Sequence, residues 1–281
     1  MIQQTSKPGR WDLTFLSDLP SGGALLMVKK RIMEHGLMSK PRSFKSSQSV
    51  RSFTLIELLV TIAIIGILAA LLMSALGSAK NKASEVSDLS NLKQQMIATQ
   101  LYASDNHDVL PCPNWDGGQS DRPGWLYTAD LTLLPPAEFK VETGLFWKIL
   151  HNPKLYFCPM DRTNSSLFLQ RPQQISSYAM NGAVVGYPPP GVFTVTPVKS
   201  SAMRPTDCAF WETDETRPAY FNDGANYPDE GVSGRHREGG IQATFGGTVD
   251  YIKTNVWHMD VVDTNRNRLW CYPGTPDGRA P

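Results

Sequence analysis

The sequence predicts an α+β fold in which one long N-terminal helix, membrane-spanning in its first half, packs on a small antiparallel sheet with long loops. Three observations support this prediction. An apolar run of about 24 residues begins at Phe53, and proline is absent from there to Val109. Beyond Pro111, short apolar runs alternate with segments rich in glycine and proline, as expected for a loop-rich domain of short strands.

The segment before the apolar run, residues 1–52, is basic. Seven lysines and arginines lie between residues 29 and 51, and Glu34 is the one acidic residue among them. Basic residues next to a membrane span favour the cytoplasmic side. We therefore expect residues 1–52 to form a cytoplasmic leader.

The apolar run itself, residues 53–76, is long enough to cross a bilayer as a helix. It is too long for the apolar core of a cleaved secretory signal, and it carries a carboxylate, Glu57, near its start. An ionised group in hydrocarbon is costly, so Glu57 requires a functional explanation.

The second half of the helix, residues 77–110, is expected to be amphipathic. Its apolar positions recur at helical spacing: they are Val86, Leu89, Leu92, Met96, Thr99 and Ala103. Polar residues were expected on the opposite side: Asp88, Asn91, Gln94 and Gln95. The polar residues 105–108 and then Pro111 predict where the helix ends. A plain membrane anchor followed by a separate helix is the alternative.

Residues 111–281 are expected to form the β domain. Four short runs read as strands: residues 155–158, 208–212, 241–245 and 248–252. Only Gly246 and Gly247 separate the last two, and glycine accepts the positive φ of a tight two-residue hairpin turn. We therefore predict a hairpin with this pair as its turn.

Several classes of function are not supported by the composition or motifs. A net charge of +1 and a pI of about 7.7 give no basis for nucleic-acid binding. No P-loop, dinucleotide fingerprint or G-x-S-x-G elbow occurs, so no enzymatic activity is predicted and no catalytic residue is assigned. No cofactor is predicted either.

The four cysteines are Cys112, Cys158, Cys208 and Cys271. None forms a CxxC pair, which argues against a zinc ribbon, and no metal site is predicted. In an oxidising compartment one or two disulfides could form, but sequence cannot choose among the three pairings.

The N-terminal motif "SFTLIELLVTIAIIGILAALL" resembles the processing site of type IV prepilins and type II secretion pseudopilins. The resemblance implies cleavage by a prepilin peptidase between Ser52 and Phe53, followed by N-methylation of Phe53 by the same enzyme. It also implies that Glu57, the fifth mature residue, sets the register of assembly. Ser52 stands where the family usually has glycine.

Weaker resemblances lie further along the chain, in "YFCPMD" (156–161), "SSYAMN" (176–181) and the half-helix before Pro111. Related pseudopilin-like proteins often carry a histidine followed, after nine residues, by Asp-Gly. Here His236 is followed at that distance by Gly246-Gly247, so the aspartate is missing. We interpret His236 as a structural or loop histidine, with a ligand or a catalytic base as the alternative.

Two further segments have alternative interpretations. Some pseudopilins bind Ca²⁺ in a C-terminal loop, and oxygen-rich loops suit this ion. The acidic residues of 212–231 are Glu212, Asp214, Glu215, Asp223, Asp229 and Glu230, but they lack EF-hand spacing, so a solvated loop is favoured. Trp115, Trp125 and Trp147 could line a carbohydrate surface, although core packing explains tryptophan more often.

Together these features predict a pseudopilin-like structural subunit of a periplasmic pseudopilus or pilus-like fibre that serves protein secretion. Its expected partners are other pilin subunits, the prepilin peptidase and an inner-membrane secretion platform. We expect a single-pass inner-membrane protein with a cytoplasmic N-terminus and a periplasmic C-terminal domain. The alternative is a membrane-anchored periplasmic binding protein or enzyme that uses the motif for export only.

The leader predicts the position of the start codon. A 52-residue leader is long for a prepilin, whereas a start at Met38 leaves a typical short basic one, and Met33 is the second candidate. Changing Met38 to a non-start codon is expected to abolish the mature product on an immunoblot. An unchanged yield of mature protein would contradict this expectation.

Overall fold

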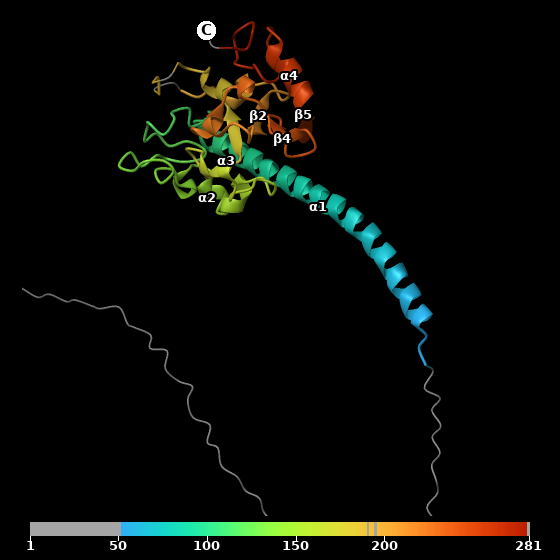
Figure 1. The fold of residues 1–281 in the computed structure, drawn as a ribbon. Helices are drawn as coiled ribbons and strands as arrows, with labels where there is room; N and C mark the ends of the chain where they lie inside the picture. Colours follow the sequence, from blue (N-terminus) through green and yellow to red (C-terminus); the bar gives the residue numbers. More distant parts are fainter. Residues whose placement is uncertain (1–51, 190, 194–195, 280–281) are drawn as a thin grey trace, which may run out of the picture. The chain divides into compact units, whose positions relative to one another are not determined.

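One continuous helix, α1 (Leu55–Asp105), dominates the computed structural model, which describes residues 52–189, 191–193 and 196–279 (Figure 1). The leader up to residue 51, with both candidate start codons, lies outside the described residues. The long helix predicted from the apolar run is confirmed, and it runs unbroken through both halves. It ends where predicted: the backbone of His107 and Asp108 is left-handed, and the Asp108 amide donates to the Ala103 carbonyl at 2.8 Å.

The second half of α1 buries one face against β4, β5, the turn η2 and α2. Four residues of the predicted stripe are buried: Leu92, Met96, Thr99 and Ala103. Burying Leu92 and Met96 contributes about 1.5–3 kcal/mol each. Val86, however, is exposed.

The predicted polar side of the helix was wrong at Asp88 and Gln95, since both are buried. Their polar atoms have partners from distant parts of the chain, which makes burial tolerable. Gln95 Nε2 donates to the Leu155 carbonyl at 2.9 Å, and Asp88 faces His236.

The sheet has five strands in the order β3-β1-β2-β4-β5. The strands are β1 (Tyr178–Asn181), β2 (Cys208–Glu212), β3 (Ala225–Asn226), β4 (Gly239–Thr244) and β5 (Val249–Lys253). The predicted antiparallel sheet is correct for β1-β2, β2-β4 and β4-β5, but β3 pairs with β1 in parallel. The connection between β2 and β3 is long, so the chain can cross to the edge of the sheet beside β1 and run there in the same direction as β1.

Short helices and turns fill the connections. The helices are α2 (Trp147–Leu150), α3 (Ser166–Leu169) and α4 (Thr254–Val262). The 3-10 turns are η1 (Val141–Thr143), η2 (Pro153–Tyr156), η3 (Gly182–Val185), η4 (Ser200–Ala202), η5 (Pro218–Phe221) and η6 (Pro228–Glu230).

The strand predicted at residues 155–158 is wrong, because this segment overlaps η2. Asn152 caps the turn by accepting the Lys154 amide at 3.1 Å, and Pro153 follows at the first helical position. A capping asparagine and an N-terminal proline both favour a helical turn, and they outweigh the strand preference of the aromatic residues after them.

Trp125 is fully buried, which supports core packing and not a carbohydrate surface at this position. Its ring lies 5.0 Å from that of Phe210 and 5.7 Å from that of Phe146, measured between centroids. Trp115 and Trp147 are half-buried, and Trp115 packs edge-on against Tyr227.

The predicted β4-β5 hairpin is confirmed, but its loop has three residues, from Phe245 to Gly247. Thr244 donates its amide to the Thr248 carbonyl at 2.9 Å, which closes the loop. Only Gly247 has a positive φ, of 83°. Gly246 is required for another reason: a Cβ there would lie 2.7 Å from the Pro205 carbonyl oxygen.

Replacing Gly247 with valine is expected to lower the free energy of unfolding by about 1–3 kcal/mol, because a β-branched residue resists a positive φ. Urea unfolding of the full chain in detergent, followed by tryptophan fluorescence, measures this loss. Gly234→Val is the control, since that position is open and has no positive φ. Equal stability of the two variants would contradict the strained loop.

Candidate functional site

The first half of α1 exposes apolar side chains on all sides. Its leucine, isoleucine, valine and methionine side chains between Leu55 and Leu76 are 49–80% exposed. The helix is long and apolar enough to cross a membrane, and no residue of its most apolar stretch is buried against the rest of the protein. This surface is suited to lipid or to other helices of the same kind.

The residues of the predicted processing site lie at the start of this surface. Ser52 and Phe53 are exposed, and Glu57 is exposed in the first turn of α1. A carboxylate in the first turn interacts favourably with the helix dipole, by up to about 1 kcal/mol.

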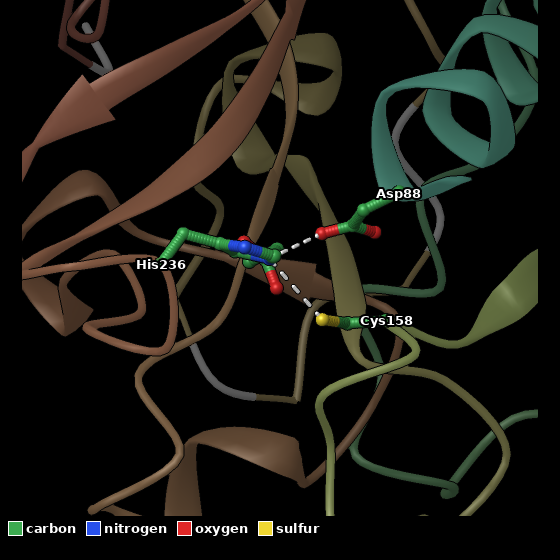
Figure 2. Close-up of side chains that lie close together, drawn as sticks. Asp88, Cys158 and His236 are labelled. Atoms are coloured by element: carbon green, nitrogen blue, oxygen red, sulfur yellow. Dashed lines mark hydrogen bonds and ion pairs between the residues drawn. The ribbon is translucent and has the colours of Figure 1, made fainter. Parts of the chain in front are cut away.

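A second cluster lies in the domain, around His236 in the loop before β4. His236 Nε2 lies 2.8 Å from Asp88 Oδ2, 3.3 Å from Cys158 Sγ and 3.4 Å from Glu212 Oε2. Figure 2 shows the imidazole pointing toward Asp88 on α1 and toward Cys158, with Cys158 in the segment after η2. All four side chains are buried. The cluster therefore joins α1, the η2 segment, β2 and the β4 loop at one point.

Neighbouring groups hold three members of the cluster, Asp88, Glu212 and Cys158. The Tyr178 hydroxyl donates to Asp88 Oδ1. Glu212 accepts from Arg235 Nη1 at 3.0 Å and from the Ile241 amide at 2.8 Å. Cys158 Sγ accepts the Met160 amide at 3.3 Å.

Burial and mutual charge set the protonation of the cluster. Burial, together with the charge of Glu212, raises the pKa of Asp88 above its usual value. Burial alone would also raise the pKa of Glu212, but the hydrogen bond with His236 and the charge of Arg235 lower it. Burial acts to lower the pKa of His236, but its bonds with Asp88 and Glu212 outweigh this and raise it to about 9.

A buried ionic network continues from Glu212. Arg235, whose side chain is 5% exposed, also lies 3.5 Å from Asp161 Oδ2 and 3.7 Å from Glu215 Oε2. Arg171 forms a paired contact with Asp161, at 2.7 and 3.0 Å. Such bidentate pairs fix geometry strongly.

The segment from His236 to Gly247 contacts α1 at both ends. His236 meets Asp88 at one end of β4, and at the other end Lys93 Nζ donates to the Gly247 carbonyl at 2.6 Å. The structure does not bring His236 and Gly247 together, since they flank opposite ends of β4. The β4-β5 hairpin is thus fastened along the second half of α1.

The other candidate residues are dispersed. All four cysteines are free: Cys158 belongs to the cluster, whereas Cys208 and Cys271 are buried elsewhere and Cys112 is half-buried. The acidic residues of 212–231 are divided among several places: Glu215 shares Arg235 with Glu212, whereas Asp214 accepts the Thr216 amide within its own turn. Glu212 lies in the cluster, and Asp223 accepts backbone amides of Gly117 and Ala225 at 2.9 Å.

Among known families, the model described as the prokaryotic N-terminal methylation motif matches residues 48–73. The chain thus has a prepilin-type N-terminal motif, which supports a type IV pilin-like protein, and its apolar helix fits a single-pass membrane anchor. The segment from His236 to Gly247 lies outside the match. Comparisons with curated proteins and with solved structures find no match.

The cluster around His236 was not predicted from the sequence. No partner of His236 is marked in the sequence, whereas in the structure its side chain contacts two carboxylates and a thiol. The residues are scattered from Asp88 to His236 with no metal-binding spacing. The weaker resemblances to pseudopilin-like proteins were the available signals, since they single out His236 and the segments 156–161 and 176–181, which supply Cys158 and Tyr178.

Proposed function

We propose that this chain is a pseudopilin-like structural subunit that assembles through α1 into a periplasmic pilus-like fibre serving protein secretion. Prepilin peptidase cleaves it between Ser52 and Phe53 and methylates Phe53. The leader stays in the cytoplasm, and the domain beyond α1 lies in the periplasm. The subunit has no catalytic role.

One observation supports this proposal above the others: the methylation motif occupies the start of a helix that is apolar and exposed all round in its first half. A lipid anchor needs only that apolar half. A fibre subunit also needs its domain fixed rigidly to the helix, so that neighbouring helices and domains keep one register. The contacts of Asp88, Gln95 and Lys93 with the domain provide this attachment.

The test combines processing with assembly. The full chain, expressed with a prepilin peptidase, is expected to yield a mature product that begins at methylated Phe53 by mass spectrometry. Single cysteines placed in turn across residues 58–72 are expected to give crosslinked ladders at some positions and not at others. Complete processing with only monomers at every position would favour the anchored enzyme or binding protein.

A further inference from the structure

A single nitrogen faces three acceptors in the His236 cluster. His236 Nε2 carries at most one hydrogen, yet Asp88, Cys158 and Glu212 each place an acceptor atom within 3.4 Å of it. One proton can be directed at only one of the three. A metal ion bonded to Nε2 is instead shared by all of them.

The separations suit a small metal ion. Around a tetrahedral zinc, ligand atoms lie about 3.3–3.8 Å apart, given Zn–N near 2.0 Å and Zn–S near 2.3 Å. The four ligand atoms here lie within 4.8 Å of one another, and two of the contacts of Nε2 are 3.3 and 3.4 Å. Of the three contacts of Nε2, the one with Asp88, at 2.8 Å, has to lengthen.

The buried charges also balance when a divalent cation is bound. Asp88, Glu212 and Asp161 are anionic, with side chains at most 4% exposed, and Arg171 and Arg235 supply two buried positive charges in the same network. Without an ion, a protonated His236 balances the remaining negative charge. With the ion, Cys158 is a thiolate and His236 is neutral, so the divalent cation balances the two negative charges that remain.

Three of the four groups, Asp88, Glu212 and Cys158, are oriented by a further contact. Tyr178 holds Asp88, and Arg235 together with the Ile241 amide holds Glu212. The Met160 amide donates to Cys158 Sγ from two residues further along the chain. Contacts of this type orient metal ligands and raise affinity.

We propose that Asp88, Cys158, Glu212 and His236 bind one zinc-type divalent transition-metal ion. A thiolate, an imidazole and carboxylates are the ligand set that suits zinc. On binding, Cys158 gives up its thiol proton and the protonated His236 gives up its Nε2 proton, both to solvent, so that His236 coordinates as neutral imidazole through Nε2. All four positions come from the protein, so the ion is structural and locks α1 to the domain.

A depression of about 300 Å³ lined by Met160, Asp161, Arg171 and Arg235, among others, opens beside the network.

The test uses the full chain, purified in detergent without a histidine tag, stripped with a chelator and reloaded. With zinc, elemental analysis is expected to find about one ion per chain. With Co²⁺, we expect the intense visible bands of a tetrahedral site and a near-ultraviolet thiolate-to-cobalt band. Cys158→Ser is expected to remove the thiolate band, and His236→Gln to lower the zinc affinity at least about tenfold, equivalent to 1.4 kcal/mol.

Cys271→Ser is the matched control, because Cys271 is equally buried and lies outside the cluster. It is expected to keep both the zinc and the cobalt spectrum. Circular dichroism of every sample establishes that the chain remains folded. A folded parent chain that takes up no zinc overturns the proposal, and the cluster is then an ion-pair network around a protonated His236. Zinc that persists unchanged in folded Cys158→Ser and His236→Gln overturns it as well, since the ion then binds elsewhere.

Discussion

Replacing Arg235 with methionine is expected to lower the free energy of unfolding by about 3–5 kcal/mol, a large part of the stability of a typical domain. Arg235 lies between three carboxylates: its contacts with Glu212, Asp161 and Glu215 are 3.0, 3.5 and 3.7 Å. Methionine preserves much of the side-chain volume but leaves these carboxylates without their shared cation. Urea unfolding of the full chain in detergent, at one fixed metal content, measures the loss.

Arg237, two residues further along, provides the control. Its side chain is 76% exposed and pairs with Glu85 at 2.9 Å. Glu85 is buried but also pairs with Lys82, so it keeps a cation when the exposed Arg237 is replaced, and Arg237→Met is expected to be close to the parent chain. If both variants unfold at the same urea concentration, the network around Arg235 does not hold the domain together.

These two arginines show that the burial of a polar side chain could not be predicted from the sequence around it. Both lie in the same polar stretch, "GRHREGG" (234–240), and nothing local distinguishes them. Arg235 is enclosed because Asp161 and Glu212 reach it from other segments, whereas Arg237 remains at the surface. Burial of a polar side chain depends on partners that lie far away in the sequence.

The parts of the fold with local signals were predictable. The extent of α1 follows from an apolar run, the absence of proline and a polar stop. Strand β2 was predicted with its observed bounds, Cys208–Glu212, because a compact apolar run marks it. The two residues of β3 are too few to produce any pattern, and their parallel pairing depends on the path of a long connection.

The same distinction holds for the candidate sites. The prepilin-type motif is contiguous, so Ser52, Phe53 and Glu57 could be assigned from sequence. The His236 cluster assembles from four segments, with Asp88 and His236 separated by 148 positions. The helical pattern even placed Asp88 on the wrong side of α1, since an aspartate is normally exposed unless a distant partner is known.

Replacing Glu57 with leucine is expected to block assembly while membrane insertion and leader cleavage continue. Leucine makes the span more apolar, so insertion is not impaired. In a fibre the helices pack into a dry core, where a buried carboxylate and a buried amine are tolerable only as a pair. The resemblance to prepilins implies that Glu57 pairs with the α-amine of Phe53 in a neighbouring subunit. The variant leaves that amine without its partner, at a cost of about 3–5 kcal/mol, or at least about a hundredfold in association.

Because the pair that the resemblance implies would form only when a subunit enters at the correct axial position, we expect the carboxylate to specify register more than to add stability. Glu57→Asp, whose side chain is one methylene shorter, is therefore expected to assemble poorly although its charge is unchanged. Thr61→Leu is the matched control: it also replaces a polar residue in the span, but its hydroxyl is already bonded to the Leu58 carbonyl of its own helix, at 2.8 Å. Leader removal and helix-to-helix cysteine crosslinking are compared in the same cells for all three variants. Ladders from Glu57→Leu as strong as those from Thr61→Leu would show that Glu57 does not set the register.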